Sequence, residues 1–297
     1  MESIVNVGTI AQYNALKDVE TRHPLITAFD SSKAKPLPNG KFNFGFYAVF
    51  LKGVNCGELK YGRSSYDYEA GTLVFMGPGQ VLGIKSQQNY NPKGNALLFH
   101  PDFIKGTALA TKMHNYSFFS YELNEALHIS EKEQQLVKDL FSKIDYELDQ
   151  SIDKHSKQIV ANTIELLLNY CERFYDRQFI TREHLNMGIL ANFEKSLNTY
   201  FHSENPQKYG LPSVSYFAEQ SNLSPNYFGD LIKAETGKSA KEYIHLKLID
   251  LAKDKIFDTS KSISEIAFEL GFKYPQHFNR MFKKNTGYTP NEYRFLN

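Results

Sequence analysis

Residues 262–294, SISEIAFELGFKYPQHFNRMFKKNTGYTPNEYR, decide the fold of the C-terminal third of the chain. The apolar residues at the start of this stretch recur at spacings of three and four, which predicts a short amphipathic helix: Ile263, Ile266, Ala267 and Leu270. Gly271 follows at the place where a left-handed residue ends a helix. A second helix is expected from about Pro275, because proline is tolerated in the first turn. The stretch therefore predicts a helix-turn-helix.

The second helix has an apolar side and a polar side. Its apolar positions are Phe278, Met281 and Phe282. The polar positions carry side chains of the types that hydrogen-bond base edges or neutralise phosphates: Gln276, His277, Asn279, Arg280, Lys283 and Lys284. The formal net charge of the whole chain is only +1, so any electrostatic footprint for nucleic acid must be local, as in this basic segment, which also holds Lys273 and Arg294. A helical hairpin with a merely solvated charged face is the alternative.

A second copy of the motif favours the DNA-binding interpretation. Residues 217–237, FAEQSNLSPNYFGDLIKAETG, align with residues 266–287, so that Phe228 matches Phe278 and Gly237 matches Gly287. The turn differs by one residue, and residues 240–258 between the copies read as one long helix. Repetition of a motif after about fifty residues is a feature of repeated structural units.

This C-terminal region resembles the DNA-binding domain of the AraC/XylS family of bacterial transcription regulators. The residues that carry the resemblance are Ile263, Glu265, Ile266, Ala267, Leu270, Gly271, Phe272, Phe278, Arg280, Phe282, Lys283, Lys284, Gly287, Thr289, Pro290, Tyr293 and Arg294. The resemblance implies two recognition helices that enter successive segments of the major groove on one face of double-stranded DNA.

The resemblance also implies a set of DNA-contacting residues, alongside the polar face of the second helix. They are Ser224, Asn226, Tyr227, Asp230 and Lys233 in the first motif, and Lys273, Gln276, His277, Asn279, Arg280, Lys283 and Lys284 in the second. Asp230 departs from the pattern, because it stands where the second motif has Arg280 and where a basic residue is common. We therefore expect the first motif to dock more loosely, with an Asp230–Lys233 surface pair as the alternative.

Residues 23–101 read as short strands, with aromatic and β-branched runs separated by turn signals, as in a β-sandwich or barrel. The segment from Tyr68 to Gln80, YEAGTLVFMGPGQ, resembles the cupin-like effector domain often joined to AraC-type DNA-binding domains. Metal-binding cupins need several converging ligands, whereas the histidines of this region stand singly: His23, His100 and His114. No metal site, cofactor or catalytic residue is therefore expected. Five aromatic residues line a ligand pocket or form packed core: Phe29, Phe44, Phe46, Tyr47 and Phe75.

Residues 130–148 and 157–175 are predicted to be amphipathic helices, the first with a capping box at Ser130 and Glu133. Their apolar stripes, which include Leu140 and Leu167, must be buried either on the barrel or on a partner subunit. A homodimer is preferred because this region commonly dimerises in the family. The polar segment that follows is expected to be a linker.

These features predict an α+β multidomain chain. It has a cupin-like β-barrel with a helical dimerisation element, then an all-α domain with two helix-turn-helix motifs joined by a long helix. The expected bounds are 1–115 for the sensor domain, 116–176 for the dimerisation element, 177–187 for the linker and 188–297 for the DNA-binding domain.

Composition indicates a cytoplasmic protein with no membrane partner. Cys56 and Cys171 are far apart, so neither a disulfide framework nor a thiolate metal site is suggested. The N-terminus lacks the pattern of a signal peptide, and no apolar run approaches the roughly twenty residues of a membrane span.

The leading hypothesis is a sequence-specific transcription regulator controlled by a small-molecule effector in the barrel. The resemblance favours an activator, which implies RNA polymerase as a partner. One alternative is an effector-independent regulator whose barrel is a dimer scaffold. The other is a cupin enzyme fused to a DNA-binding domain, against which the lack of a metal-ligand pattern counts.

Overall fold

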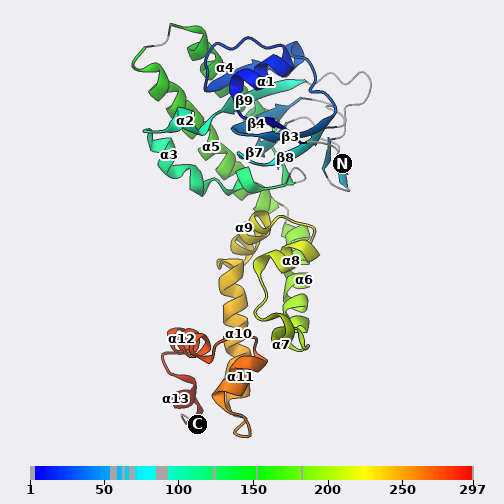
Figure 1. Cartoon of the computed structure of the whole chain (residues 1–297), viewed down its shortest axis with the longest axis vertical. Helices are drawn as coiled ribbons and strands as arrows, with labels where there is room; N and C mark the ends of the chain where they lie inside the picture. Colours follow the sequence, from blue (N-terminus) through cyan, green and yellow to red (C-terminus); the bar gives the residue numbers. More distant parts are fainter. Residues whose placement is uncertain are drawn as a thin grey trace. The chain divides into compact units, whose positions relative to one another are not determined.

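The computed structural model describes residues 4–53, 59–61, 64–66, 71–84, 93–122, 125–151, 153–181 and 183–295. The chain divides into two compact units, Met1–Gln178 and Phe179–Asn297 (Figure 1). The first unit contains the strands, and the second is helical. Cys56 and the first three residues of the cupin-like segment, Tyr68 to Ala70, lie outside the described residues.

Two main sheets form the first unit. The larger has the order β10-β7-β4-β9-β2 and is antiparallel throughout; its strands are β2 (Ile26–Asp30), β4 (Tyr47–Lys52), β7 (Thr72–Met76), β9 (Gly94–Phe99) and β10 (Leu127–His128). The smaller has the order β1-β3-β8, with strands β1 (Ile4–Val7), β3 (Gly40–Phe44) and β8 (Val81–Ile84). A ribbon pairs β5 (Leu59–Tyr61) with β6 (Ser64–Tyr66). The predicted β-rich unit is confirmed, with the described strands in open sheets that do not close into one barrel.

The five-stranded sheet separates two packed layers, because alternate residues of each strand point to opposite faces. One face packs against α1 (Ile10–Lys17) and residues of the smaller sheet, in a core cluster that includes Ala48 of β4. The other face meets aromatic side chains; the Phe75 ring lies 4.5 Å from that of Phe118 and 6.0 Å from that of Tyr175. Short helical segments join β9 to β10: α2 (Pro101–Ile104), α3 (Ala108–Lys112), η2 (Met113–Asn115) and η3 (Ser117–Ser120). Another, η1 (Ser31–Lys33), follows β2.

The aromatic residues predicted to line a pocket or form core mainly form core. Phe44 and Phe46 are buried in the layer beside α1, with their rings 5.4 Å apart. Phe75 is buried on the opposite face of the sheet, and Tyr47 stacks on Phe99 at 5.1 Å. Phe29 is only partly buried against the α1 layer.

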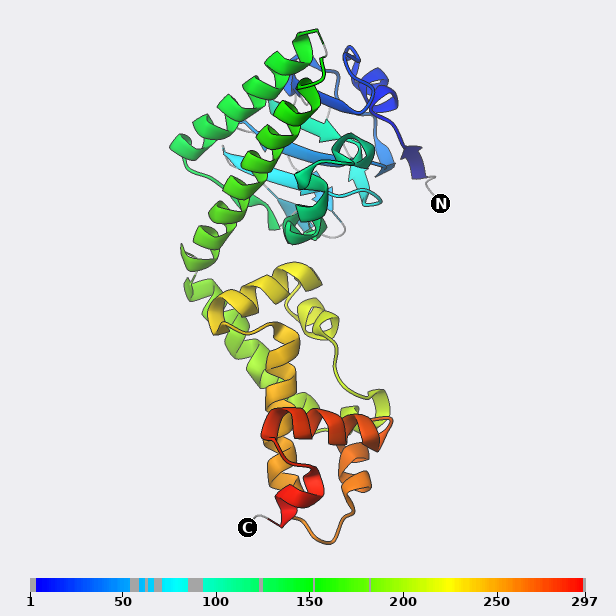
Figure 2. The ribbon, with the colours of Figure 1, turned by 90° about the vertical axis from the view of Figure 1, so that its left-hand side faces the viewer.

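The two long helices, α4 (Glu131–Asp149) and α5 (Ser156–Thr181), pack on their own unit (Figure 2). The predicted capping box is present, with Ser130 Oγ accepting from the Glu133 amide and the Glu133 carboxylate accepting from the Ser130 amide. Leu140 is 4% exposed and Leu167 is fully buried, and α4 contacts β2 and β9. The expectation that Leu140 and Leu167 face a partner subunit is therefore wrong, because packing within the first unit already buries both side chains.

The predicted linker, residues 177–187, is largely helical, because α5 continues to Thr181 and α6 (Glu183–Phe201) begins two residues later. Gln178 holds the end of α5 to the first unit: its side-chain oxygen accepts from the His128 amide at 2.8 Å and its amide nitrogen donates to the Ala126 carbonyl at 3.3 Å. The boundary between the two compact units falls directly after Gln178. The other predicted domain bounds stay predictions.

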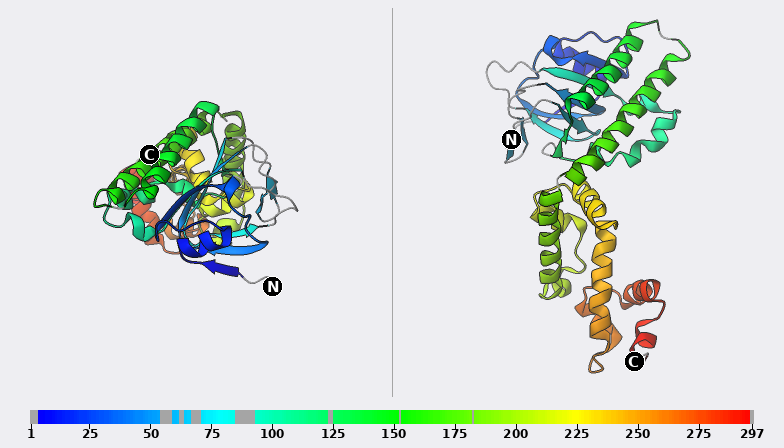
Figure 3. Two further views of the ribbon diagram at one scale, coloured as in Figure 1. Left: turned by 90° about the horizontal axis from the view of Figure 1, so that it is seen from above. Right: turned by 180° about the vertical axis from the view of Figure 1, so that it is seen from behind.

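The second unit is the predicted all-α domain with two helix-turn-helix motifs. Its helices after α6 are α7 (Asn205–Tyr209), α8 (Val214–Gln220), α9 (Pro225–Thr236), α10 (Ala240–Ile256), α11 (Ile263–Glu269), α12 (Pro275–Thr286) and α13 (Pro290–Arg294). The segment expected to be a loop before the first motif thus contains α7. Within this unit α10 runs between the α8–α9 motif and the α11–α12 motif (Figure 3).

The two motifs have matching turns. The Leu223 amide donates to the Ala218 carbonyl at 3.0 Å, and the Phe272 amide donates to the Ala267 carbonyl at 2.9 Å. Asn222 and Gly271 precede these amides and have positive φ angles of 54° and 93°. Because the repeat extends to backbone hydrogen bonds, the predicted internal duplication is confirmed. No helix in the described ranges is both long enough and apolar enough to span a bilayer.

Candidate DNA interface

Helix α12 has a fully buried side and a polar exposed side. Phe278 and Phe282 are completely buried, and their rings lie 5.7 Å apart. The predicted DNA-contacting residues of this motif are all exposed: Lys273, Gln276, His277, Asn279, Arg280, Lys283 and Lys284. No carboxylate among the described residues forms an ion pair with the three lysines or the arginine of this group. Their charges are therefore available to an external anion.

An aromatic side chain that the sequence analysis did not select lies at the start of α12. Tyr274 is half-exposed, and its ring lies 5.6 Å from that of His277. The Lys273 ammonium lies 5.7 Å from the centre of the same ring, at cation–π distance. This contact positions Lys273 and His277 together at the N-terminal end of the helix, where backbone amides and the helix dipole also favour phosphate.

Arg294 belongs to the local positive charge counted in the sequence but has a structural role. Its guanidinium donates to three carbonyls, those of Ile256 at 2.6 Å, Asp258 at 3.3 Å and Lys261 at 3.0 Å. These carbonyls lie at and after the end of α10. Arg294 thus ties α13 to that helix end and is not free for phosphate.

The first motif presents fewer charged groups. Asn226 and Lys233 are exposed on α9, whereas Asp230 is half-buried. Ser224 Oγ accepts from the Tyr227 amide at 3.2 Å as the N-cap of α9, and the Tyr227 ring packs on Phe179 at 5.1 Å. The roles assigned to all five residues in DNA contact stay predictions.

The long helix α10 adds two groups that the sequence analysis missed. Lys241 is exposed, and His245 is half-buried one turn further on. Burial lowers the pKa of His245, and so do the positive charges of Lys241 and of Lys284 on α12. A basic edge therefore continues from α12 onto α10. The signal in the sequence was the spacing of four between Lys241 and His245, which places both on one helix face.

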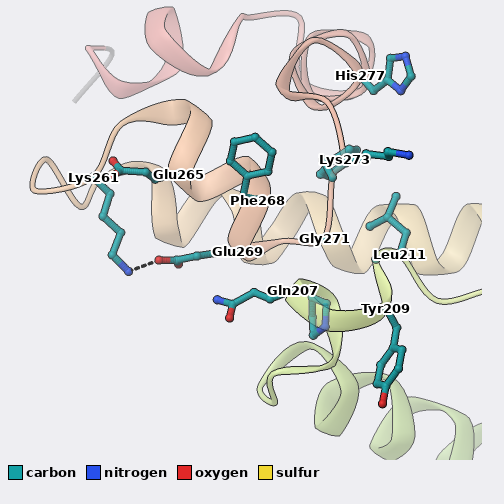
Figure 4. A pocket seen from close by; sticks show the side chains of 13 residues that line it. Gln207, Tyr209, Leu211, Lys261, Glu265, Phe268, Glu269, Gly271, Lys273 and His277 are labelled. Carbon is teal, nitrogen blue, oxygen red and sulfur yellow. Dashed lines mark hydrogen bonds and ion pairs between the residues drawn. The ribbon is translucent and has the colours of Figure 1, made fainter.

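A groove of about 900 Å³ lies between α7 and the second motif (Figure 4). Phe268 and Tyr209 are exposed at its wall, the Lys261–Glu269 ion pair lies at one end, and Lys273 lies toward α12. At its base the backbones of Gly271 and Gly210 approach each other closely: a Cβ on Gly271 would lie 2.9 Å from the Gly210 carbonyl carbon. This contact joins α7 to α11 and helps to fix the second motif within the domain.

The described residues contain no candidate metal centre. No group of three or more potential metal ligands occurs among them. Two histidines of the first unit act in local structure: His23 Nδ1 accepts from the Leu25 amide at 3.1 Å, and His100 Nδ1 accepts from the Asp102 amide at 3.2 Å as the N-cap of α2. Burial raises the pKa of the Cys171 thiol well above its ordinary value, so this thiol is unreactive.

The chain is similar in sequence to known helix-turn-helix proteins. A family model for a helix-turn-helix domain matches residues 217–295. A protein described as a probable transcriptional regulator, LumQ of Photobacterium leiognathi, is 24% identical over 241 residues, which cover 79% of this chain and 86% of that protein. An uncharacterized transcriptional regulatory protein, YesN of Bacillus subtilis, is 40% identical over 74 residues, which cover 24% of this chain and 20% of that protein. A transcriptional regulator of Chromobacterium violaceum with an AraC-type DNA-binding domain matches in structure with 26% identity and a TM-score of 0.27, covering 28% of this chain and 74% of that one.

The helix-turn-helix motif occurs twice in this unit, and the second copy exposes a basic helix. This arrangement defines a DNA-binding protein. The C-terminal motifs match the helix-turn-helix family model, and the chain is similar to transcription regulators. These similarities indicate which class of DNA-binding protein it resembles. Residues 217–295 form a helix-turn-helix domain of the AraC type, and the chain is similar to DNA-binding transcription regulators.

Proposed function

We propose that the chain is a sequence-specific regulator of promoters, acting in the cytoplasm, in which α12 supplies most of the base recognition. The exposure of every predicted contact residue on α12, without a competing carboxylate partner, carries this proposal. The first motif contributes the weaker half of the site, because the position equivalent to Arg280 holds an acid, Asp230, which phosphate repels.

Within α12 the proposal divides base reading from phosphate contact. Arg280 is the base reader, since a guanidinium can donate two parallel hydrogen bonds to guanine. Lys283 and Lys284 lie in the last turn of the helix and contact phosphate, which anchors the protein without regard to sequence. The basic edge formed with Lys241 and His245 on α10 extends the phosphate contacts.

The proposal gives the first unit the role of a sensor and assembly domain. It is compact in itself, with its own core, so a ligand or a second copy could act on it separately from the DNA-binding domain. We propose a small-molecule effector, a homodimer and activation through RNA polymerase as parts of this function. The relatives described as regulators support regulation in preference to catalysis.

Arg280→Ala and Lys283→Ala test the division of roles on α12. DNA sites are first selected from a random pool with the wild-type protein, and affinities for selected and unrelated DNA are then measured at fixed salt. Arg280→Ala should lose about 1–3 kcal/mol on the selected site and little on unrelated DNA. Lys283→Ala should weaken both equally and reduce the salt slope by about one.

The two variants serve as controls for each other, because both side chains are exposed and neither should affect folding. If Arg280→Ala weakens selected and unrelated DNA to the same extent, the base-reading role is wrong. If the selected pool shows no common sequence, sequence-specific recognition itself is wrong.

A further inference from the structure

Tyr274 precedes helix α12, and neither capping nor core packing accounts for it. It occupies the N-cap position, but its side chain makes no capping hydrogen bond. The helix therefore forgoes the stabilisation that a capping oxygen gives. The side chain is also 50% exposed, whereas Phe272, two residues earlier, is 6% exposed. A large aromatic side chain at this position serves the surface of the protein and not its interior.

The first motif shows which residue would serve the fold at this position. Ser224 precedes Pro225 at the start of α9, as Tyr274 precedes Pro275 at the start of α12. Ser224 Oγ accepts from the Tyr227 amide at 3.2 Å. Helices α8, α10, α11 and α13 also begin at a side-chain oxygen that accepts from a backbone amide, which belongs to Ser213, Ser239, Ser262 and Thr289. In the second motif a phenol ring replaces this oxygen.

The Tyr274 ring lies beside residues that are proposed to contact DNA. Its centre is 5.6 Å from that of the His277 ring, with the ring planes at 70°, and 5.7 Å from the Lys273 ammonium. Lys273 and His277 extend to the same side at the start of α12 (Figure 4). His277 and Arg280 are exposed and three residues apart, so they are neighbours on the helix surface. The ring therefore extends the exposed surface around Arg280 toward the N-terminal end of the helix.

An exposed ring at this end of a recognition helix is suited to an apolar group on a base edge. The N-terminal residues of such a helix contact base edges in the major groove. All four bases present hydrogen-bonding groups there, and thymine also presents a C5-methyl group, which apolar side chains contact. The Lys273 ammonium beside the ring is a group that contacts phosphate, which would hold the ring at the edge of the groove.

We propose that Tyr274 recognises a thymine, through contact of its ring with the C5-methyl group in the major groove. This inference rests on the proposed function, because it adds a second specificity-determining residue to Arg280. Six residues separate the two, which is about 9 Å along a helix. At about 3.4 Å per base step, the thymine lies within about three base pairs of the guanine that Arg280 contacts.

Replacement of thymine by deoxyuridine tests this contact, because it removes the methyl group and leaves the hydrogen-bonding groups of the base in place. Each thymine of a site selected by the wild-type protein is replaced in turn, and the affinity of the full-length chain is measured by fluorescence anisotropy at fixed salt. The guanine is identified as the base whose discrimination is lost in Arg280→Ala. Replacement of one thymine near this guanine should weaken binding about fourfold, the effect of uncovering one methyl-sized group.

Three variants assign the effect to the ring. Tyr274→Ser should bind the thymine and deoxyuridine duplexes equally, and Tyr274→Phe, which keeps the ring, should retain the fourfold preference. Tyr288→Ser is the matched control and should also retain it, because Tyr288 lies beyond the other end of α12 with a similar exposure of 47%. Tyr274→Ser should melt higher than the wild type, by roughly 2 °C or more, because serine supplies the missing cap.

The proposal fails if no thymine near the guanine depends on its methyl group, or if Tyr274→Ser keeps the preference. An equal loss of affinity for selected and unrelated DNA in Tyr274→Phe would mean that the hydroxyl contacts phosphate, and it would overturn the proposal. A lower melting temperature of Tyr274→Ser would do the same, because the ring would then support the fold. A selected pool without a common sequence contradicts the proposed function. A common sequence that depends on Arg280 but not on Tyr274 contradicts this inference alone.

Discussion

His245 is neutral at pH 7 in the free protein, because burial and the charges of Lys241 and Lys284 hold its pKa below the ordinary value. Folding therefore becomes less favourable as the pH falls through the unfolded-state pKa of about 6.5, since the unfolded chain takes up the proton more readily. Bound DNA is expected to raise the pKa of His245 instead of lowering it. A phosphate beside the three groups stabilises the charged imidazole, so that binding is coupled to proton uptake.

The DNA affinity of the wild-type protein should accordingly rise as the pH falls from 7.5 to 6, by roughly threefold or more at constant salt. His245→Gln should remove this dependence while leaving affinity at pH 7.5 nearly unchanged. Fluorescence anisotropy with a labelled duplex measures both. His277→Gln tests the other histidine of the candidate DNA interface, which lies on the exposed face of α12. A pH dependence that persists in His245→Gln and disappears in His277→Gln would reassign the titrating group.

Single residues could be predicted where the helix period alone decides their position. The exposed face of α12 follows directly from the burial of Phe278 and Phe282, so its polar residues were identified correctly as exposed. Arg294 could not be assigned, because its role depends on carbonyls at the end of α10 that lie more than thirty residues away in the chain. His245 was missed for the same reason, since Lys284 approaches it only in the folded domain.

At the scale of elements, a helix could be predicted where strong apolar periodicity stands beside a capping residue. Helix α4 has both and follows its predicted capping serine, Ser130. Helix α11 was predicted from its period alone, and its capping box at Ser262 and Glu265 was not recognised. Helix α1 was not predicted, although Thr9 and Gln12 form a capping box, because its buried face includes Asn14 and Lys17 and so lacks an apolar pattern. The stripes of α4 and α5 were found but given the wrong partner, since an apolar stripe does not say which surface covers it.

The contact between Gly271 and Gly210 is a junction between elements that depends on the absence of side chains. Gly271 has a φ of 93°, and an added Cβ would also lie 3.1 Å from the Pro206 carbonyl oxygen. Gly271→Ala should therefore destabilise the second unit by about 1–3 kcal/mol, through both backbone strain and displacement of α7. Gly287→Ala is the control: its φ is 82°, but nothing lies within 4 Å of the added carbon.

Urea unfolding followed by circular dichroism measures both variants, and DNA affinity is recorded with each. Gly287→Ala should show only the backbone cost, about 1 kcal/mol. Equal losses in the two variants would mean that the close approach of Gly271 to Gly210 contributes nothing to the stability of the domain.

For the molecule as a whole, the sequence predicted a β-rich unit followed by a duplicated helix-turn-helix unit, and both are present. Two kinds of local pattern made this possible: turn signals between short strands, and an internal repeat. The helical form of the predicted linker was not recognised, because polar residues such as Arg177 and Gln178 suit a helix as well as a loop. Assembly is harder still to predict, since it depends on which apolar residues remain exposed after folding.

Helix α5 offers the exposed residues on which a dimer can be tested. Ile159 and Leu166 are 48% and 45% exposed, and their spacing of seven places them on one face of the helix. This face differs from the one that buries Leu167 against the first unit. We expect a symmetric dimer in which the Ile159–Leu166 face of one copy packs against the same face of the other.

The double variant Ile159→Glu, Leu166→Glu should be monomeric with unchanged helix content, because exposed positions accept charge without disturbing the core. Leu167→Glu should instead unfold the first unit, since a charge would be buried there. Sedimentation equilibrium gives the mass, and circular dichroism gives the fold.

The monomer should bind a single site with unchanged base preference but lower overall affinity, because the second copy no longer adds its phosphate contacts. A double variant that still sediments as a dimer would place the interface elsewhere, and a wild-type monomer at tens of micromolar protein would argue against assembly through this helix at all.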